Sequence, residues 1–128
     1  IDVLLSNASI KIDDLHFNAT DLICTKGPEF ELLNTQQHTL LFESSFSISK
    51  DVSRMGYRLN ELIENDVPTL LTSSVLPGTV QLTPSGTLII LTRDCQVTGG
   101  YPRILQLSEK AINILSQKKA GQKIEFSI

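Results

Sequence analysis

The chain has 128 residues, 41% of them hydrophobic and 20% charged, with a formal net charge of −3 at pH 7. This length and composition predict one globular domain with a substantial core. The negative net charge argues against a protein that binds a nucleic-acid backbone. No apolar run approaches the roughly 18 residues of a membrane span.

The chain opens with residues 1–20, which we expect to be a strand or connecting segment that follows a missing N-terminal half. Residues 21–25 form a short apolar run, and this run predicts a strand. Pro28 suits the first turn of a short helix that ends near residue 34. Glu29 favours the same helix, because a carboxylate is stabilised near a helix N-terminus.

Three short strands are expected next, at residues 39–42, 45–49 and 54–59. In the third of these, alternation places Tyr57 on one face with Met55 and Leu59. Arg54 and Arg58 lie together on the other face. If Tyr57 points into a barrel, the two arginines therefore face outward or into a groove.

The second half of the chain predicts a hairpin, a helix and a final strand. The hairpin pairs residues 79–82 with 87–91 through a turn at 83–86, which has proline and glycine where a type I turn favours them. Residues 108–119 predict a helix that Ser108 caps and Gly121 ends, and residues 123–128 alternate as a strand. Many short strands with two short helices predict a mainly β fold, a closed barrel with peripheral helices.

Two segments with glycine directly before tyrosine stand about 40 residues apart, at Gly56-Tyr57 and at Gly100-Tyr101. Glycine permits close backbone approach, and tyrosine joins an apolar ring to one polar group. The second segment follows the apolar strand 88–91, so its polar groups are delivered to a rim. The predicted cleft is lined by Asp94, Gln96, Thr98, Gly99, Gly100 and Tyr101. The alternative is a strand end with a Gly-Gly turn, in which Tyr101 fills the core.

The two arginines of the first segment allow two interpretations. A guanidinium group binds carboxylate or phosphate with two parallel hydrogen bonds, so Arg54 and Arg58 predict an anion site. The alternative is a surface ion pair, for example between Arg54 and Asp51.

The histidines and cysteines predict no metal site. His16 and His38 have no Cys or carboxylate at metal-ligand spacing. Cys24 and Cys95 lie in apolar, strand-like contexts and are interpreted as buried free thiols in a reducing compartment, although a disulfide stays open.

Several blocks of the sequence resemble one known family. The chain is similar to the C-terminal part of the allophanate hydrolase subunit 2 family, also described as the family of biotin-dependent carboxyltransferases or of 5-oxoprolinase C subunits, which includes an antagonist of a sporulation-kinase inhibitor. The match begins near residue 20 and runs to the end. The matching blocks are residues 27–29, 51–59, 73–82, 84–86 and 94–103.

The resemblance implies a cyclophilin-like β-barrel subdomain over residues 21–128, taken from a longer protein. It does not imply proline-isomerase activity. Members of the family act in ATP-dependent 5-oxoprolinases, in biotin-dependent urea carboxylases, or by binding a kinase inhibitor. The implied partner is a subunit 1 protein, similar to the B subunit of such complexes, and the implied location is the cytoplasm. We expect no nucleic-acid or membrane partner.

The leading hypothesis is an ATP-dependent hydrolase that opens the cyclic amide 5-oxoproline, with the isolated fragment inactive. Arg54 and Arg58 would face the developing anion of a phosphorylated amide oxygen. Tyr57, Tyr101 and Thr98 would orient the amide, and Asp94 would act as base or hold a donor. Gln96, Gly99 and Gly100 complete the predicted substrate-binding set.

Two alternatives remain open. One is a carboxyltransferase domain of a urea carboxylase, with biotin as cofactor. The other is a non-catalytic module whose tyrosines and arginines dock subunit 1, because both residue types are favoured at interfaces. Apolar surface exposed by separation from a neighbouring domain would also favour self-association of the fragment.

Overall fold

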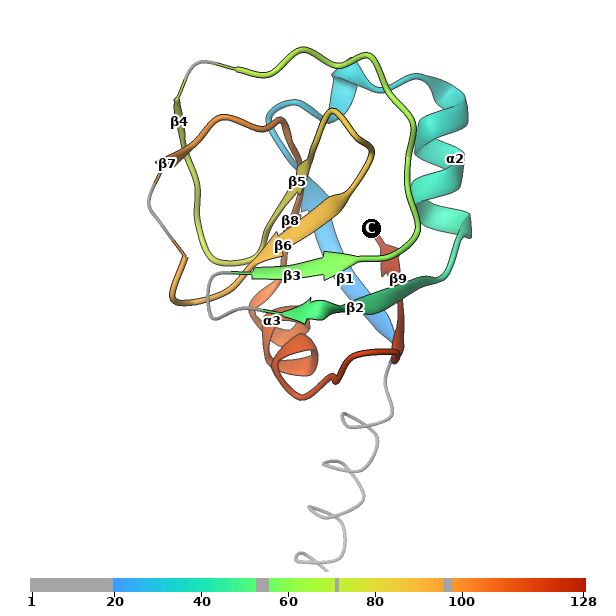
Figure 1. The fold of residues 1–128 in the computed structure, drawn as a ribbon, viewed down its shortest axis with the longest axis vertical. Helices are drawn as coiled ribbons and strands as arrows, with labels where there is room; N and C mark the ends of the chain where they lie inside the picture. The colour runs from blue at the N-terminus through green and yellow to red at the C-terminus, as the bar shows by residue number, and fades with distance from the viewer. Residues whose placement is uncertain (1–19, 53–55, 71, 96–97) are drawn as a thin grey trace, which may run out of the picture.

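The computed structural model describes residues 20–52, 56–70, 72–95 and 98–128. In this part of the chain, seven strands form a closed barrel in the order β1-β8-β5-β6-β3-β2-β9 (Figure 1). The barrel closes where β1 (Asp21–Lys26) runs parallel to β9 (Lys123–Ser127). The prediction of a mainly β closed barrel with short peripheral helices is confirmed.

The other barrel strands are antiparallel to their neighbours. They are β2 (Phe46–Val52), β3 (Gly56–Leu59), β5 (Thr79–Leu82), β6 (Leu88–Leu91) and β8 (Arg103–Leu107). Two further strands, β4 (Ser73–Ser74) and β7 (Thr98–Gly99), pair only with each other. In Figure 1 this small sheet lies on the left, on the side opposite helix α2.

The core follows from the period-2 alternation of the strands. The register places Ile90 opposite Val80, and Val80 opposite Leu105, and all three side chains are fully buried. At one side of the core the rings of Phe46 and Phe126 lie 5.5 Å apart. Each such aliphatic or aromatic side chain contributes roughly 1.5–3 kcal/mol by leaving water.

The predicted hairpin between β5 and β6 is present. The Gly86 N–H donates to the carbonyl of Thr83 at 2.9 Å, which closes the four-residue turn. Gly86 has a φ of +93°, a region that residues with a Cβ rarely adopt. The turn residues are therefore those that this backbone geometry requires.

The prediction of a strand at residues 39–42 is wrong, because this segment lies in helix α2 (Thr35–Glu43). Asn34 and Gln37 form a reciprocal capping box, in which each side chain accepts from the other's backbone N–H at 2.8 Å. The helix expected from Pro28 is a single 3-10 turn, η1 (Phe30–Leu32). An apolar run of only three residues, Leu40, Leu41 and Phe42, does not distinguish a strand from a helix, and the capping box decides it.

Helix α3 (Glu109–Ser116) confirms the predicted C-terminal helix, and Ser108 caps it as expected. The Ser108 hydroxyl accepts from the Ala111 N–H at 3.1 Å. The helix ends at Ser116, earlier than the predicted residue 119. Gly121 lies in the turn before β9, where its N–H donates to the Ile48 carbonyl at 2.8 Å. Among the described residues, no helix is long and apolar enough to cross a membrane.

Candidate functional site

The site begins where β3 meets β6 at one rim of the barrel. Tyr57 lies opposite Ile90, and Arg58 lies opposite Ile89, on the other face of the strand. Tyr57 is half-buried and packs against the core, as Leu59 does on the same face. The predicted alternation, with tyrosine inward and arginine outward, is therefore confirmed for Tyr57, Leu59 and Arg58.

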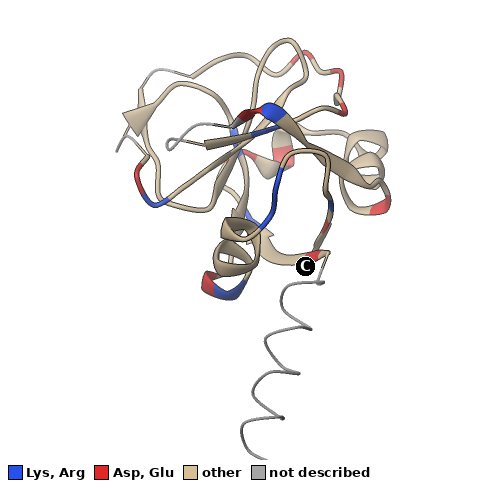
Figure 2. Ribbon diagram, turned by 60° about the horizontal axis from the view of Figure 1, so that its bottom comes forward, with Lys and Arg blue, Asp and Glu red and all other residues tan. Residues whose placement is uncertain are grey.

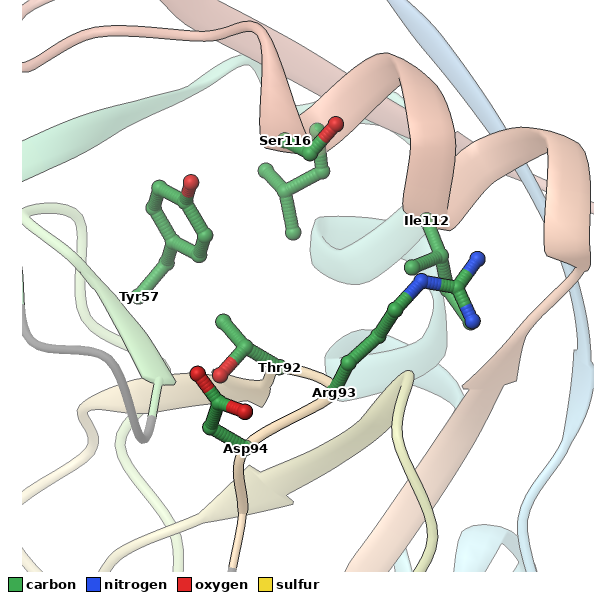
Figure 3. A pocket seen from close by; sticks show the side chains of 7 residues that line it. Tyr57, Thr92, Arg93, Asp94, Ile112 and Ser116 are labelled. Atoms are coloured by element: carbon green, nitrogen blue, oxygen red, sulfur yellow. The ribbon is translucent and has the colours of Figure 1, made fainter.

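A pocket of about 250 Å³ opens between this rim and helix α3. Its lining comes from three elements: β3, the segment directly after β6, and α3 (Figure 3). The lining residues are Tyr57, Thr92, Arg93, Asp94, Ile112, Leu115 and Ser116. Two of the predicted site residues, Tyr57 and Asp94, thus come together although 36 positions separate them in the sequence.

The pocket combines one apolar wall with several polar groups. Ile112 and Leu115 of α3 contribute aliphatic side chains to the lining. In Figure 3, Ile112 lies across the hollow from Tyr57. The Asp94 carboxylate accepts hydrogen bonds, and the Tyr57 hydroxyl both donates and accepts. The Ser116 hydroxyl already donates to the Asn113 carbonyl at 2.7 Å. Small polar ligands are commonly bound this way, with an apolar surround and a few convergent polar groups. A small amide fits such a pocket, because its N–H can meet a carboxylate and its C=O a hydroxyl.

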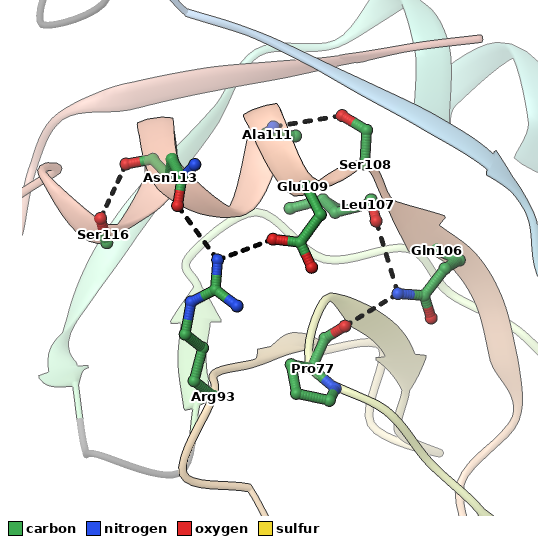
Figure 4. A network of polar contacts seen from close by, with 9 residues as sticks. All are labelled: Pro77, Arg93, Gln106, Leu107, Ser108, Glu109, Ala111, Asn113 and Ser116. Carbon is green, nitrogen blue, oxygen red and sulfur yellow. Dashed lines mark hydrogen bonds and ion pairs between the residues drawn. The ribbon is translucent and has the colours of Figure 1, made fainter.

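Arg93 connects the rim to the helix (Figure 4). Its Nη2 donates to Glu109 Oε2 at 2.8 Å and to Asn113 Oδ1 at 3.1 Å. Of the seven lining residues, Arg93 carries the formal positive charge, and Glu109 offsets it. Among the described residues, the pocket lining therefore has no cation that is uncommitted to another side chain.

The remaining described members of the predicted site lie elsewhere. Thr98 and Gly99 form β7, paired with Ser74 and Ser73 of β4. Tyr101 follows this strand and is 38% exposed, so it does not fill the core. None of Arg58, Thr98, Gly99, Gly100 or Tyr101 is among the described residues that line the pocket. Arg54 and Gln96 lie outside the described residues.

The two predicted backbone glycines do permit close approach, as expected. A Cβ built on Gly99 would lie 2.7 Å from Gln81 Nε2, and one built on Gly100 would lie 3.3 Å from the Leu70 carbonyl oxygen. The Gly100 carbonyl also accepts from the Leu70 N–H at 2.7 Å. What approaches these glycines is protein, a side chain in one case and a backbone segment in the other.

His38, the histidine that the structure describes, and the two cysteines are explained by packing and burial. The His38 ring stacks on Phe30 with centroids 4.1 Å apart. Cys24 is buried, and burial raises the pKa of its thiol to about 11. Its S–H donates to the Ser127 carbonyl at 3.3 Å. Cys95 is half-buried, and burial raises its pKa as well. Both thiols are free, and the described residues contain no cluster of three or more metal-binding side chains.

Charged residues of both signs occur on several elements, and Figure 2 shows no separation of the described ribbon into a basic and an acidic half. Close to the site, Arg93 pairs with Glu109. A more buried pair lies on the outer barrel face, where Arg103 Nη2 is 2.7 Å from Glu29 Oε1. These cations are paired within the domain.

Sequence reasoning missed the contribution of α3 to the pocket. The apolar stripe with Ile112 and Leu115 is typical of a core-facing helix, and both residues are indeed buried. That Ser116 at the end of the helix also lines the pocket depends on how α3 lies across the barrel end, and the helix pattern does not contain this information. The sequence feature that comes nearest to indicating this pocket is the polar segment 92–94, directly after a buried strand.

The chain matches known proteins over most of its length. A family model described as "Carboxyltransferase domain, subdomain A and B" matches residues 7–128. The chain belongs to this carboxyltransferase-domain family. It is 36% identical over 102 residues to the C subunit of 5-oxoprolinase from Escherichia coli K12, covering 78% of this chain and 33% of the relative. It is 31% identical over 100 residues to the C subunit of the Haemophilus influenzae 5-oxoprolinase, covering 77% of this chain and 32% of that relative.

Solved structures agree on the fold of this carboxyltransferase-type domain. A crystal structure of TTHA0988 matches with a TM-score of 0.70 at 26% identity, covering 86% of this chain and 21% of that one. The Kluyveromyces lactis urea carboxylase matches with a TM-score of 0.72 at 17% identity, covering 85% of this chain and 11% of that one, which shows a shared fold. The chain spans about one third of the length of the 5-oxoprolinase relatives it matches.

Proposed function

We propose that the chain is the pocket-bearing part of a subunit that acts on 5-oxoproline in an ATP-dependent complex. The observation that carries this proposal is the meeting of Tyr57 and Asp94 in one pocket of about 250 Å³, in a chain whose relatives are named as C subunits of 5-oxoprolinase. One water adds across the lactam C–N bond, which breaks to yield glutamate, and a second water is consumed as ATP is cleaved to ADP and phosphate.

In this proposal the pocket holds the lactam. Asp94 accepts the lactam N–H or a proton from the attacking water, and Tyr57 donates its hydroxyl hydrogen to the amide oxygen. Ile112 and Leu115 cover the ring carbons, and their burial is consistent with a dry wall. The Thr98–Tyr101 segment and Arg58 lie outside the pocket lining, and we assign them to the side that faces the rest of the protein.

The ATP site is proposed to lie outside this pocket. A triphosphate requires several uncommitted cationic or backbone N–H donors. Arg93, the cation in the pocket lining, is already bound to Glu109 and Asn113. The described residues of the pocket therefore do not fit ATP. We place ATP on another part of the protein or on a partner subunit. We propose that the complex is heteromeric and located in the cytoplasm. The proposed partner is a subunit 1 protein, similar to the B subunit of such complexes.

A second candidate is a docking role for the segment around Tyr101. Two large apolar side chains near the β4–β7 sheet are exposed, with Leu76 at 63% and Tyr101 at 38%. Exposed tyrosine and leucine are typical of a surface that contacts another domain or subunit. This candidate is compatible with catalysis in the pocket, because the two surfaces have different lining residues.

The test is a reconstituted assay with the full-length protein and its partner subunits. Glutamate release from 5-oxoproline is measured with and without ATP, and with and without the full-length protein. The proposal expects release only when both are present. Biotin-dependent carboxylation of urea in the same mixture would replace it with the carboxyltransferase alternative. A stable complex that turns over neither compound would leave only the docking role.

A further inference from the structure

A second pocket, of about 290 Å³, lies where the end of β1 runs beside β8. We call it the Arg103 pocket. One wall comes from residues 25–28, and another from the segment between β4 and the start of β5. Its lining residues are Thr25, Lys26, Gly27, Pro28, Ser74, Leu76, Thr79, Arg103, Leu105 and Gln106. None of them lines the pocket of Tyr57 and Asp94, so the two pockets are separate.

The lining of the Arg103 pocket is positively charged. It contains two cations, Lys26 and Arg103, and no acidic residue among the described lining residues. The carboxylates that pair with these cations, Glu31 and Glu29, stand outside the lining. The first pocket differs in this respect, because Asp94 is part of its lining. An anionic ligand in the Arg103 pocket therefore meets cations and no lining carboxylate.

Arg103 is a fixed part of this pocket. Its Nε lies 3.1 Å from both carboxylate oxygens of Glu29, its Nη2 donates to Glu29 Oε1 at 2.7 Å, and its Nη1 donates to the Ser74 carbonyl at 2.8 Å. Its side chain is 21% exposed. These bonds engage each of the three nitrogens, and a guanidinium group has five N–H groups in all. Arg103 is thus held in place while N–H groups of its two terminal nitrogens stay available to a ligand.

Lys26 is the adaptable cation of the pair. Its Nζ lies 3.6 Å from Glu31 Oε1, and the two side chains are 58% and 76% exposed. Exposed pairs of this kind contribute little to stability, so Lys26 can exchange Glu31 for another anion at small cost. The Nζ also lies 5.2 Å from the centre of the Phe30 ring, a cation–π contact that keeps the ammonium group near the pocket.

The rest of the lining sets the kind of anion that fits. Pro28, Leu76 and Leu105 contribute aliphatic surface. Leu105 is fully buried and Leu76 is 63% exposed, so apolar surface extends from the barrel wall to the open side of the pocket. Both polar ends of the Gln106 amide are bonded within the domain. A polyphosphate would need more cationic donors than these. A single carboxylate on a short hydrocarbon chain matches both the cations and the apolar surface.

We propose that the Arg103 pocket binds a small organic acid. Its carboxylate lies against Lys26 and the terminal nitrogens of Arg103, and its hydrocarbon part lies against Pro28 and Leu76. The pocket volume of about 290 Å³ is at the small end for ligand sites, which suits an acid of a few carbon atoms. This inference is independent of the proposed function, because it concerns a separate pocket and binding without turnover.

The test is a titration of the full-length protein with butyrate, followed by NMR of its labelled leucine methyl groups. The signals of Leu76 and Leu105 should shift and saturate, while that of Leu115 in the first pocket should not move. Butyramide has nearly the same shape and no charge, and it should bind at least about tenfold more weakly than butyrate. Inorganic phosphate, titrated in the same way, shows whether the site prefers a carboxylate.

Two variants change the charge at the pocket in opposite directions. Lys26→Met should weaken butyrate binding at least about tenfold, since it removes the adaptable cation. Glu31→Gln removes the carboxylate that competes for Lys26, and it should tighten binding by about twofold or more. Lys123→Met is the matched control, because it removes the same charge from an exposed position on β9 outside the lining, and it should leave binding unchanged.

Several results would overturn the inference. They are no saturable shift with butyrate, a shift confined to Leu115, equal binding of butyrate and butyramide, and unchanged binding in Lys26→Met. Saturable binding of phosphate without butyrate would exclude an organic acid as the ligand. If butyrate does not bind and Lys26→Met instead loses the partner subunit in co-purification, the pocket receives an acidic side chain of that partner, which also overturns the inference. Since all these readouts are binding, absence of 5-oxoproline turnover would count against the proposed function alone.

Discussion

Arg93 Nη2 and Glu109 Oε2 lie 2.8 Å apart, so the segment that carries Asp94 is bound to the first turn of α3. The residue next to Asp94 thereby fixes how the rim faces the helix across the pocket. Both side chains are largely exposed, at 55% and 76%. Exposed ion pairs contribute little to stability. This pair matters because it holds the segment of Asp94 in a fixed position relative to α3.

Arg93→Ala is therefore expected to change activity more than stability. The free energy of unfolding should fall by less than about 1 kcal/mol. The rate of 5-oxoproline turnover should fall by about tenfold or more, because Asp94 is no longer held against α3. Urea denaturation and steady-state kinetics on the full-length complex measure the two quantities. Lys26, whose Nζ lies 3.6 Å from Glu31, provides the control, since Lys26→Ala breaks an exposed pair away from the pocket.

The glycines at positions 27 and 99 predict different costs for the same substitution. A Cβ at Gly27 would lie 2.2 Å from the Arg103 carbonyl oxygen, which is backbone and cannot rotate away. A Cβ at Gly99 would meet the end of the Gln81 side chain, which can move. Gly27→Ala should cost more than about 3 kcal/mol or prevent folding, and Gly99→Ala about 1 kcal/mol. Thermal denaturation compares them, and equal losses would contradict the packing described for β7.

The pair between Arg103 and Glu29 is expected to stabilise the outer face of the barrel. Arg103 donates to Glu29 at 2.7 Å and to the Ser74 carbonyl at 2.8 Å, and the side chains are 21% and 9% exposed. Glu29→Ala leaves a partly buried guanidinium without its carboxylate, and we expect a loss of about 2 kcal/mol. A double-mutant cycle with Arg103→Met measures the coupling. A coupling energy near zero would show that the two side chains act independently.

The Cys24 thiol predicts a dependence of stability on alkaline pH. Burial raises its pKa from 9.0 to about 11, so the folded state holds the proton more tightly than the unfolded chain. The stabilising contribution is complete below pH 9 and is lost as the pH rises from 9 to about 11, by at most roughly 3 kcal/mol. Denaturation curves for the wild type and Cys24→Ala should converge over this range. Parallel curves would mean that Cys24 does not titrate differently in the two states.

Local patterns in the sequence predict the barrel well. The β5–β6 hairpin follows from alternation and from Pro84 and Gly86, and α3 follows from Ser108 and its apolar stripe. Helix α2 escapes prediction because its central apolar run is as short as a strand, and only the capping box at Asn34 and Gln37 marks it as a helix. The signal that decides such a short segment lies at its end, in the residues that can cap a helix, and not in the apolar run itself.

The candidate site is only partly predictable. Tyr57 and Asp94 are both expected from the sequence, and the pocket brings them together. The sequence also led us to expect Tyr101 in the same wall as Tyr57 and Asp94. Tyr101 does not line the pocket, because β7 pairs with β4 and carries Tyr101 away from it. Two-residue strands such as these leave no periodic signal.

The central claim, that the pocket of Tyr57 and Asp94 is where substrate reacts, is tested most directly by the kcat of Asp94→Asn in the full-length complex. Asparagine keeps the shape of the side chain and removes the acid–base group, so stability and assembly should not change. We predict a fall in kcat of about a hundredfold or more, with Tyr57→Phe also impaired and Asp66→Asn, on an exposed loop, unaffected. A kcat for Asp94→Asn within about twofold of the wild type would contradict the claim and move the chemistry out of this chain.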